Sequence, residues 1–263
     1  TFLKEYFSIE MTKIKELQQS LANIDYIYHL ATETEHNAIE VNFNKSLREN
    51  TLALNQLLEL SIKNNIEKLV FASSGKVYGI NLDRGYSEFD CPQPNTKLGI
   101  LKKDQENILI DYAKKYKKRV VIARIFNVFG PNQKDTFIVP TILSQLDKCF
   151  VELGNIGYSR DYIFISDVIS ALTLLKDSKA EDFLEVYNIG SGQPTTVRDL
   201  INEFEFILKR EINIKQVKKK IRKENILEYS DCSRLKKLNW KQNISLKRGL
   251  LTCYNHWRED KWK

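Results

Sequence analysis

Short, continuous apolar runs alternate with longer amphipathic stretches along the first half of the chain. The runs are IDYIYHLA (24–31), EKLVFASS (67–74) and RVVIARIFNVFG (119–130). The first two lead to helical stretches near 42–64 and 98–117, and the third leads to a loop and another helix. Strands that are buried on both faces of a parallel sheet have continuous apolar runs of this kind. Their alternation with helices therefore predicts a doubly wound α/β sheet.

From about residue 135 the pattern loosens. DTFIVPTILSQLDKC (135–149) predicts a helix after a turn, and RDYIFISDVISALTLLK (160–176) predicts a strand and a helix capped by Ser166 or Asp167. EVYNIGSGQPTTVRDLINEFEFIL (185–208) predicts a strand, a Gly-rich turn and a helix that Thr196 opens, with Asp199 three residues later. We expect one domain in 1–134, to which 165–195 contributes, and a smaller C-terminal α+β lobe in 135–263.

Composition narrows the class of protein. The 263 residues are 42% hydrophobic and 29% charged, as is usual for a soluble globular protein. The chain has no apolar run near the ~20 residues that span a bilayer and no signal-peptide pattern, so we expect a cytoplasmic protein without a membrane partner. Its four cysteines are too far apart in the sequence to suggest a zinc site. The net charge of +7 comes largely from lysine runs without a stacking pattern of aromatics, which favours a solvated helix face over nucleic-acid binding. The excess positive charge would suit an anionic substrate.

Five stretches then occur in a recognisable order: YHLAT, FASSGKVYG, RIFNVFGPNQ, SRDYIFISDV and YNIGSG. In this order and spacing they resemble the extended short-chain dehydrogenase/reductases, in the branch of NAD-dependent nucleotide-sugar epimerases and dehydratases. The resemblance covers nearly the whole chain. It implies a Rossmann-like domain that binds NAD or NADP and a C-terminal lobe that holds a nucleoside diphosphate sugar.

The resemblance also implies catalytic positions. In this family a tyrosine takes a hydroxyl proton as hydride passes to the nicotinamide, and a lysine four residues later lowers the pKa of the tyrosine. Lys102 matches that lysine, and Ser74 matches the serine that binds the same sugar oxygen. Leu98 stands where the tyrosine belongs, and leucine has no ionisable proton. Tyr78 and Tyr86 do not replace it, because neither is followed by a lysine at the fourth position.

The binding residues follow from the same motifs. The resemblance assigns cofactor contacts to the following residues: Glu10, Met11, Leu30, Ala31, Ser73 and Lys102. It assigns substrate contacts to Asn127, to Ile138 in the segment FIVPTI, and to Arg160 and Arg222. A guanidinium suits the oxygens of a diphosphate, although a surface ion pair is the alternative for each arginine. A strand-end cap is the alternative for Ser74, and a solvated helix residue is the alternative for Lys102.

The beginning of the chain departs from the family pattern. The family opens with a strand, a Gly-rich turn and a helix that hold the cofactor pyrophosphate, whereas this sequence opens at what resembles the third strand. A parallel sheet without its first βαβ unit has exposed edges, so we expect a longer native chain that carries this unit, or strands supplied by another chain. NAD or NADP is expected as cofactor where the unit is present, and no cofactor otherwise.

Three functional hypotheses remain open from the sequence. The first is a nucleotide-sugar epimerase or dehydratase, either active or catalytically impaired, and the second is a pseudoenzyme that binds a nucleotide sugar or scaffolds a partner. The third is a dehydratase with altered chemistry, because some membrane-associated 4,6-dehydratases have a methionine-like residue here, in a context that PNTKLGILK faintly resembles. The later motifs are unlike that branch. The resemblance leaves a homodimer open.

Overall fold

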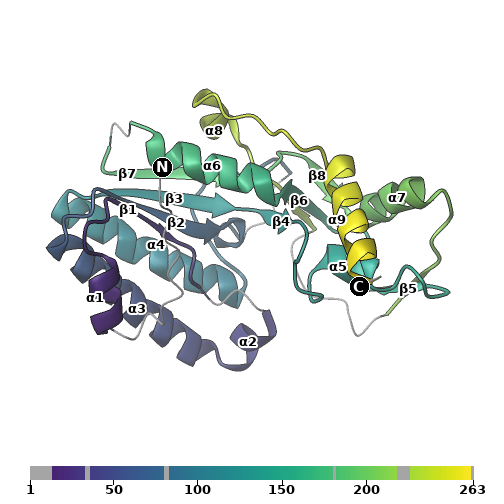
Figure 1. Cartoon of the computed structure of the whole chain (residues 1–263), viewed down its shortest axis with the longest axis horizontal. Coiled ribbons are helices and arrows are strands. Elements are labelled where there is room, and N and C mark those ends of the chain that lie inside the picture. Colours follow the sequence, from purple (N-terminus) through teal and green to yellow (C-terminus); the bar gives the residue numbers. More distant parts are fainter. Residues whose placement is uncertain (1–13, 33–35, 80–82, 180–181, 218–225, 262–263) are drawn as a thin grey trace.

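A computed structural model describes residues 14–32, 36–79, 83–179, 182–217 and 226–261 of the chain. These residues form two lobes that lie side by side, one built around a parallel sheet and one mixed in structure (Figure 1). The C-terminal helix lies in the second lobe.

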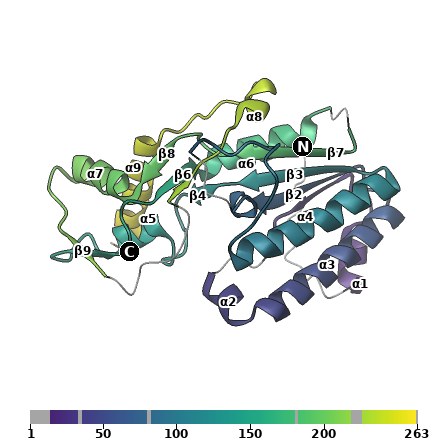
Figure 2. The same ribbon diagram turned by 180° about the vertical axis from the view of Figure 1, so that it is seen from behind.

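The first lobe contains a four-stranded parallel sheet. Its order is β1 (Tyr26–His29), β2 (Lys68–Ser74), β3 (Arg119–Ile125) and β7 (Leu184–Ile189). Helices cover both faces, and Figure 2 shows the arrangement from behind. One face carries α1 (Ile14–Ser20), α3 (Phe43–Lys63) and α4 (Lys97–Tyr116), and the other carries α6 (Ile165–Asp177) and α8 (Ser233–Lys237). The short α2 (His36–Val41) precedes α3. The doubly wound, Rossmann-like α/β prediction is confirmed.

The second lobe is built around strand β6 (Ser159–Phe164). Strands β4 (Asn127–Phe129) and β10 (Leu227–Glu228) pair with it in parallel, and β8 (Pro194–Thr196) pairs with it antiparallel. A separate pair joins β5 (Val151–Leu153) to β9 (Ile214–Gln216). In the described part of this lobe the helices are α5 (Ile138–Leu143), α7 (Val197–Leu208) and α9 (Leu246–Lys261).

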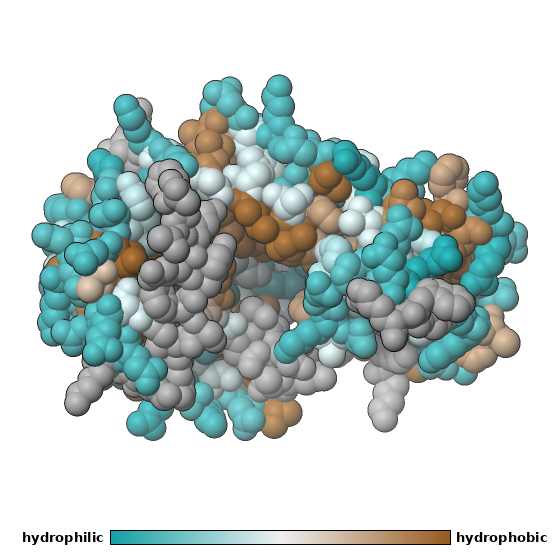
Figure 3. Space-filling model, viewed as in Figure 1, coloured by the Kyte–Doolittle hydropathy of each residue, from teal (hydrophilic) through white to brown (hydrophobic). Residues whose placement is uncertain are grey.

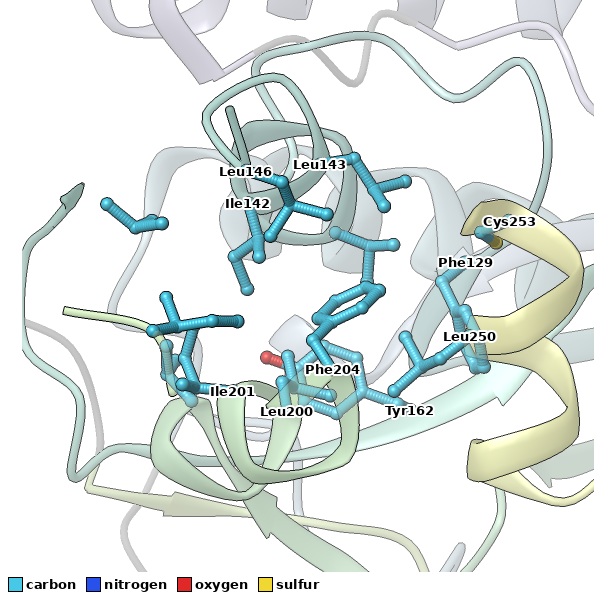
Figure 4. Close-up of a cluster of buried hydrophobic side chains, with 14 of the residues drawn as sticks. Phe129, Ile142, Leu143, Leu146, Tyr162, Leu200, Ile201, Phe204, Leu250 and Cys253 are labelled. Atoms are coloured by element: carbon cyan, nitrogen blue, oxygen red, sulfur yellow. The ribbon is translucent and has the colours of Figure 1, made fainter. Parts of the chain in front are cut away.

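The core of the second lobe lies between those helices and β6. Figure 4 shows its side chains converging from β4, α5, β6, α7 and α9. Phe129 meets the rings of Tyr162 and Phe164 edge-on, with ring centroids 6.5 and 5.4 Å apart. Burial of this apolar surface holds the lobe together, at about 25 cal/mol per Å² removed from water.

Two local predictions can be compared directly with the structure. The capping box of α7 is confirmed: Thr196 Oγ1 accepts from the backbone N–H of Asp199, whose carboxylate accepts from the N–H of Thr196. The predicted cap of α6 by Ser166 or Asp167 is wrong, because α6 begins at Ile165 after Phe164, which makes no side-chain cap. Asp167 instead accepts hydrogen bonds from the backbone N–H groups of Asn243 and Ile244.

The apolar run 119–130 is two strands rather than the single strand expected. The N–H of Phe126 still donates to Ile189 O in the first sheet, while the next residue, Asn127, pairs with Tyr162 in the second. The chain passes between the lobes at this point. Continuous hydrophobicity cannot reveal such a break, since apolar residues occur in both strands.

Candidate functional site

Lys102 lies in the middle of the candidate site, buried between α4 and the carboxyl ends of β1 and β2. Its Nζ donates to Ala72 O at 2.6 Å and to Thr32 Oγ1 at 2.9 Å, and lies 4.6 Å from the centroid of the Phe71 ring. Burial lowers the pKa of Lys102 to about 7, although the nearby Glu106 carboxylate acts in the opposite direction. The amine therefore changes its charge near neutral pH. It is not the solvated helix residue that composition alone suggests.

His29 lies close to this amine. It is buried, and its ring stacks on Phe71 with centroids 5.5 Å apart. Burial, together with the positive charge of Lys102, lowers the pKa of His29 to about 4. His29 is consequently neutral at pH 7 and carries no second proton to donate.

The position one helical turn before Lys102 lies in the first turn of α4. Thr96 caps this helix by accepting from the N–H of Gly99 at 3.1 Å, and Leu98 in the same turn is half-buried. A Cβ on Gly99 would lie 2.3 Å from Lys76 O, so only glycine allows α4 to approach the short helix η1 (Gly75–Val77) so closely. Leu98 thus lies one turn before Lys102 on a helix that is fixed in position.

Ser73 and Ser74 end strand β2 with different contacts. Ser74 Oγ accepts from the N–H of Lys76 at 3.2 Å and so caps η1. Ser73 Oγ donates to Glu106 Oε1 at 2.5 Å. Both serines lie at the carboxyl end of a central strand, which is the edge where doubly wound sheets bind their ligands.

A buried ion pair supports this edge of the sheet, and the sequence analysis missed it. Glu106 accepts from Arg124 Nε at 3.1 Å and from Arg124 Nη2 at 2.8 Å. The guanidinium lies 4.8 Å from the centroid of the Tyr78 ring, and Tyr78 Oη donates to Asn188 Oδ1 at 2.7 Å. One signal was available in the sequence: an arginine inside the buried run 119–130 needs a partner of opposite charge.

Tyr78 is part of this network and is not a substitute for the missing tyrosine. Its ring stacks on Tyr86 with centroids 4.8 Å apart, and burial raises the pKa of Tyr78 well above its ordinary value. Asn188, which accepts from Tyr78, also donates to Tyr86 O at 2.7 Å. A phenol that is buried and keeps its proton cannot act as a general base near neutrality.

On the side of the second lobe, Arg160 lies in β6. Its Nε is 3.3 Å from Glu228 Oε2, and Lys76 Nζ is 2.7 Å from the same oxygen. Asn127 begins β4, and Ile138 begins α5 and packs against the core of the lobe. The structure thus brings Arg160 next to the carboxyl end of β2, while Ile138 is half-buried against the core of the second lobe.

The other cofactor and substrate positions have different surroundings. Leu30 and Ala31 directly follow β1 and are exposed. Glu10, Met11 and Arg222 lie outside the described residues.

Figure 3 shows apolar side chains gathered in the middle of one face, beside a hollow where the two lobes meet.

Asp161 is a second polar centre that the sequence did not indicate. It is fully buried, and its carboxylate accepts from the N–H and Oγ of Ser191, the N–H of Gly192, and the N–H and Oγ of Ser230. A Cβ on Gly190 would lie 2.3 Å from Asp161 Oδ2. The YNIGSG turn is therefore held in place by this carboxylate.

The described residues fit one end of a nicotinamide dinucleotide. An amine beside a hydroxyl, as in Lys102 and Thr32, suits a ribose diol at the carboxyl ends of the strands. The sequence has no glycine before Gly75 and so contains no Gly-rich turn that fits the pyrophosphate.

Within the described ranges, no cluster of His, Cys, Asp and Glu could bind a metal ion. None of the described helices combines the length and the apolar character needed to span a membrane.

This fold, with its ligand edge and its helix carrying Lys102, defines an extended short-chain dehydrogenase/reductase. The sequence matches the NAD dependent epimerase/dehydratase family over residues 3–190, and the chain belongs to that family. It is 32% identical to the dTDP-4-dehydro-6-deoxyglucose reductase of Escherichia coli over 223 residues, which are 79% of this chain and 70% of the relative.

Solved structures agree with this assignment. The chain superimposes on the UDP-glucose 4-epimerase of Thermotoga maritima with UDP-glucose with a TM-score of 0.86 and 26% identity, covering 97% of this chain and 84% of that one. It also superimposes on the structure of RMD from Pseudomonas aeruginosa complexed with NADPH. The TM-score is 0.88 at 27% identity, and the match covers 99% of this chain and 90% of that one. The family and the fold expected from the five motifs are confirmed.

Proposed function

We propose that this protein binds a nucleoside diphosphate sugar where its two lobes meet and is impaired in the proton transfer that its family performs. The observation that carries the proposal is the pair of positions 98 and 102. Lys102 is buried at the ligand edge of the sheet, and the side chain one turn before it is the aliphatic Leu98. General acid–base catalysis is typically worth 10²–10⁴ in rate, and leucine contributes none of it.

Each residue has a role in this proposal. Arg160 binds the diphosphate, for which a guanidinium is well suited, and Asn127 contacts it from β4. Ser74 hydrogen-bonds the sugar oxygen, and Lys102 holds the ribose of the cofactor. Bound NAD or NADP would supply the hydride acceptor. The sugar lies on the lobe 135–263, and the cofactor lies on 1–134 with 165–195.

A second candidate is a nucleotide-sugar-binding protein without catalysis. Two observations favour it. The amine of Lys102 already donates to Ala72 O and Thr32 Oγ1 within the protein. In addition, Tyr78 keeps its proton and so cannot act as the base, and His29 is neutral and so has no extra proton to donate as the acid.

Calorimetric titration of the 263-residue chain with dTDP-glucose, UDP-glucose and GDP-mannose tests the binding. We expect one of these nucleotide sugars to bind, and Arg160→Ala to weaken its affinity by roughly 1.5–3 kcal/mol. Nicotinamide absorbance, with NAD or NADP added, separates the two candidates. Binding without hydride transfer supports the non-catalytic candidate, and slow transfer supports the impaired enzyme. Full turnover would disprove the impairment, and no binding of any nucleotide sugar would disprove both candidates.

A further inference from the structure

One carboxylate oxygen joins two cations that come from the two lobes. Glu228 Oε2 lies 2.7 Å from Lys76 Nζ and 3.3 Å from Arg160 Nε. The three side chains are 11%, 20% and 9% exposed, in the order Glu228, Lys76 and Arg160. This cluster of three charges is therefore largely shielded from water. Charged groups in such surroundings interact more strongly than they do at the protein surface.

Within the cluster, two cations share one carboxylate oxygen. The Glu228 carboxylate faces the ammonium of Lys76 and the guanidinium of Arg160. Lys76 lies in η1, directly after the carboxyl end of β2, where ligands bind to doubly wound sheets. Arg160 and Glu228 are paired residues of β6 and β10. The cluster is thus a preformed pair of cations at the ligand edge, with a side chain of the protein itself as its anion.

We propose that Lys76 and Arg160 form one anion subsite, that Glu228 occupies it as an internal counter-ion, and that a diphosphate displaces Glu228. This inference rests on the proposed function and adds to it Lys76 as a second diphosphate ligand and Glu228 as the residue that sets the affinity. A diphosphate brings more negative charge than one carboxylate, and its oxygens match both the guanidinium fork and the compact ammonium.

The position of Lys76 gives the subsite a fixed relation to the rest of the candidate site. A Cβ on Gly99 would lie 2.3 Å from Lys76 O, so the backbone of Lys76 is in close contact with the first turn of α4. That turn carries Leu98. The backbone from which the Lys76 side chain extends is therefore fixed relative to position 98 and to Lys102 one turn later.

Titration of three variants of the full chain with dTDP-glucose, UDP-glucose and GDP-mannose, and in parallel with inorganic pyrophosphate, tests the proposal. Glu228→Gln removes the counter-ion at nearly constant shape, and we expect it to tighten binding about tenfold, as loss of a competing charge does. Lys76→Met removes one cation, and we expect it to weaken binding about tenfold. Glu152→Gln is the matched control, because it removes the carboxylate 3.0 Å from Lys215 in an exposed pair, and it should leave affinity unchanged.

The outcomes separate this inference from the proposed function. If the parent binds a nucleotide sugar and Glu228→Gln binds it no more tightly, the counter-ion role is wrong while the proposed function stands. If no nucleotide sugar binds, the proposed function fails, and the titrations with pyrophosphate then test the anion subsite by itself. Tighter pyrophosphate binding by Glu228→Gln together with weaker binding by Lys76→Met supports the subsite. Equal pyrophosphate affinity in the parent and both variants overturns it. If Glu228 has only a structural role, the Glu228→Gln variant should have a lower melting temperature and should not bind the ligand more tightly. If that variant does not fold, unchanged affinity in Lys76→Met overturns the proposal, and weaker affinity supports it.

Discussion

Glu106 and Arg124 form a two-pronged ion pair between helix α4 and strand β3, with their side chains only 2% and 5% exposed. Ser73 donates to the same carboxylate from β2. Helix α4 and strands β2 and β3 are therefore joined through one buried carboxylate.

We expect Glu106→Ala to destabilise the protein by about 3–5 kcal/mol, because it leaves a buried guanidinium without its partner. Urea unfolding at neutral pH measures this difference. The control is Lys215→Ala, which breaks an exposed pair with Glu152 and should cost less than about 1 kcal/mol. Equal losses in the two variants would show that the buried pair makes no special contribution.

Gly99→Ala should also destabilise the protein, although alanine in a helix is normally favoured over glycine by ~1 kcal/mol. The reason is the distance of 2.3 Å between the new Cβ and Lys76 O, which forces α4 and η1 apart. We expect a loss of about 1–3 kcal/mol. Gly157→Ala is the control, since its Cβ would meet its nearest neighbour, Asn155 Oδ1, at 3.5 Å. A more stable Gly99→Ala variant would contradict the close approach.

The stability of the protein should depend on pH through Lys102. Burial lowers the pKa of this side chain from the ordinary 10.5 to about 7. Between these two values the unfolded chain binds more protons than the folded protein, so the contribution of Lys102 to the free energy of unfolding rises with pH. Below about pH 7 both states are protonated, and the full cost of burying the ammonium remains.

Two variants isolate this contribution in urea unfolding at a series of pH values. We expect Lys102→Met to lose the rise between pH 7 and 10.5, so that its stability relative to the parent is greatest near pH 7 and falls as the pH increases. Lys102→Arg stays charged throughout, so it should lose the same rise and be less stable than Lys102→Met at every pH. Parallel pH profiles for the parent and Lys102→Met would contradict the shifted pKa.

Asp161→Asn should destabilise the protein by at least about 2 kcal/mol, because hydrogen bonds to a charged group are worth ~1.5–3 kcal/mol each. The new amide group would also face N–H and O–H donors of Ser191 and Ser230 in place of an acceptor. Thermal unfolding measures the loss. Asp135→Asn serves as control because Asp135 is exposed, and a similar loss in both variants would rule out the proposed role of Asp161.

Local signals in the sequence predicted local structure well. The bounds of α3 and α4 follow from amphipathic spacing, and the start of α7 follows from Thr196 and Asp199, which are three residues apart. The location of Lys102 at the ligand edge followed from the family resemblance. These features depend on neighbours within a few residues, or on a motif order that the whole family shares.

The rest depends on contacts between residues distant in the chain. Arg124 implied a buried partner, but Glu106 could be identified only once α4 and β3 were placed side by side. Asp167 looked like a helix cap and instead binds backbone groups at 243 and 244, about a quarter of the chain away. The break at Phe126 is equally invisible, because apolar residues on both sides of it enter different sheets.

The carboxylate of Asp161 also has a consequence for the order of folding. Its partners at Ser191 and Ser230 are 30 and 69 residues away along the chain, so this centre forms only after two long loops have closed. Loop closure costs entropy before its contacts compensate for it, and distant contacts of this kind slow folding. Pairing of β2 with β3 closes one long loop, between Lys68 and Arg119, whereas the contacts of Asp161 require two. The junction of the two lobes is thus expected to assemble late, and substitutions at Asp161 are expected to speed unfolding more than they slow folding.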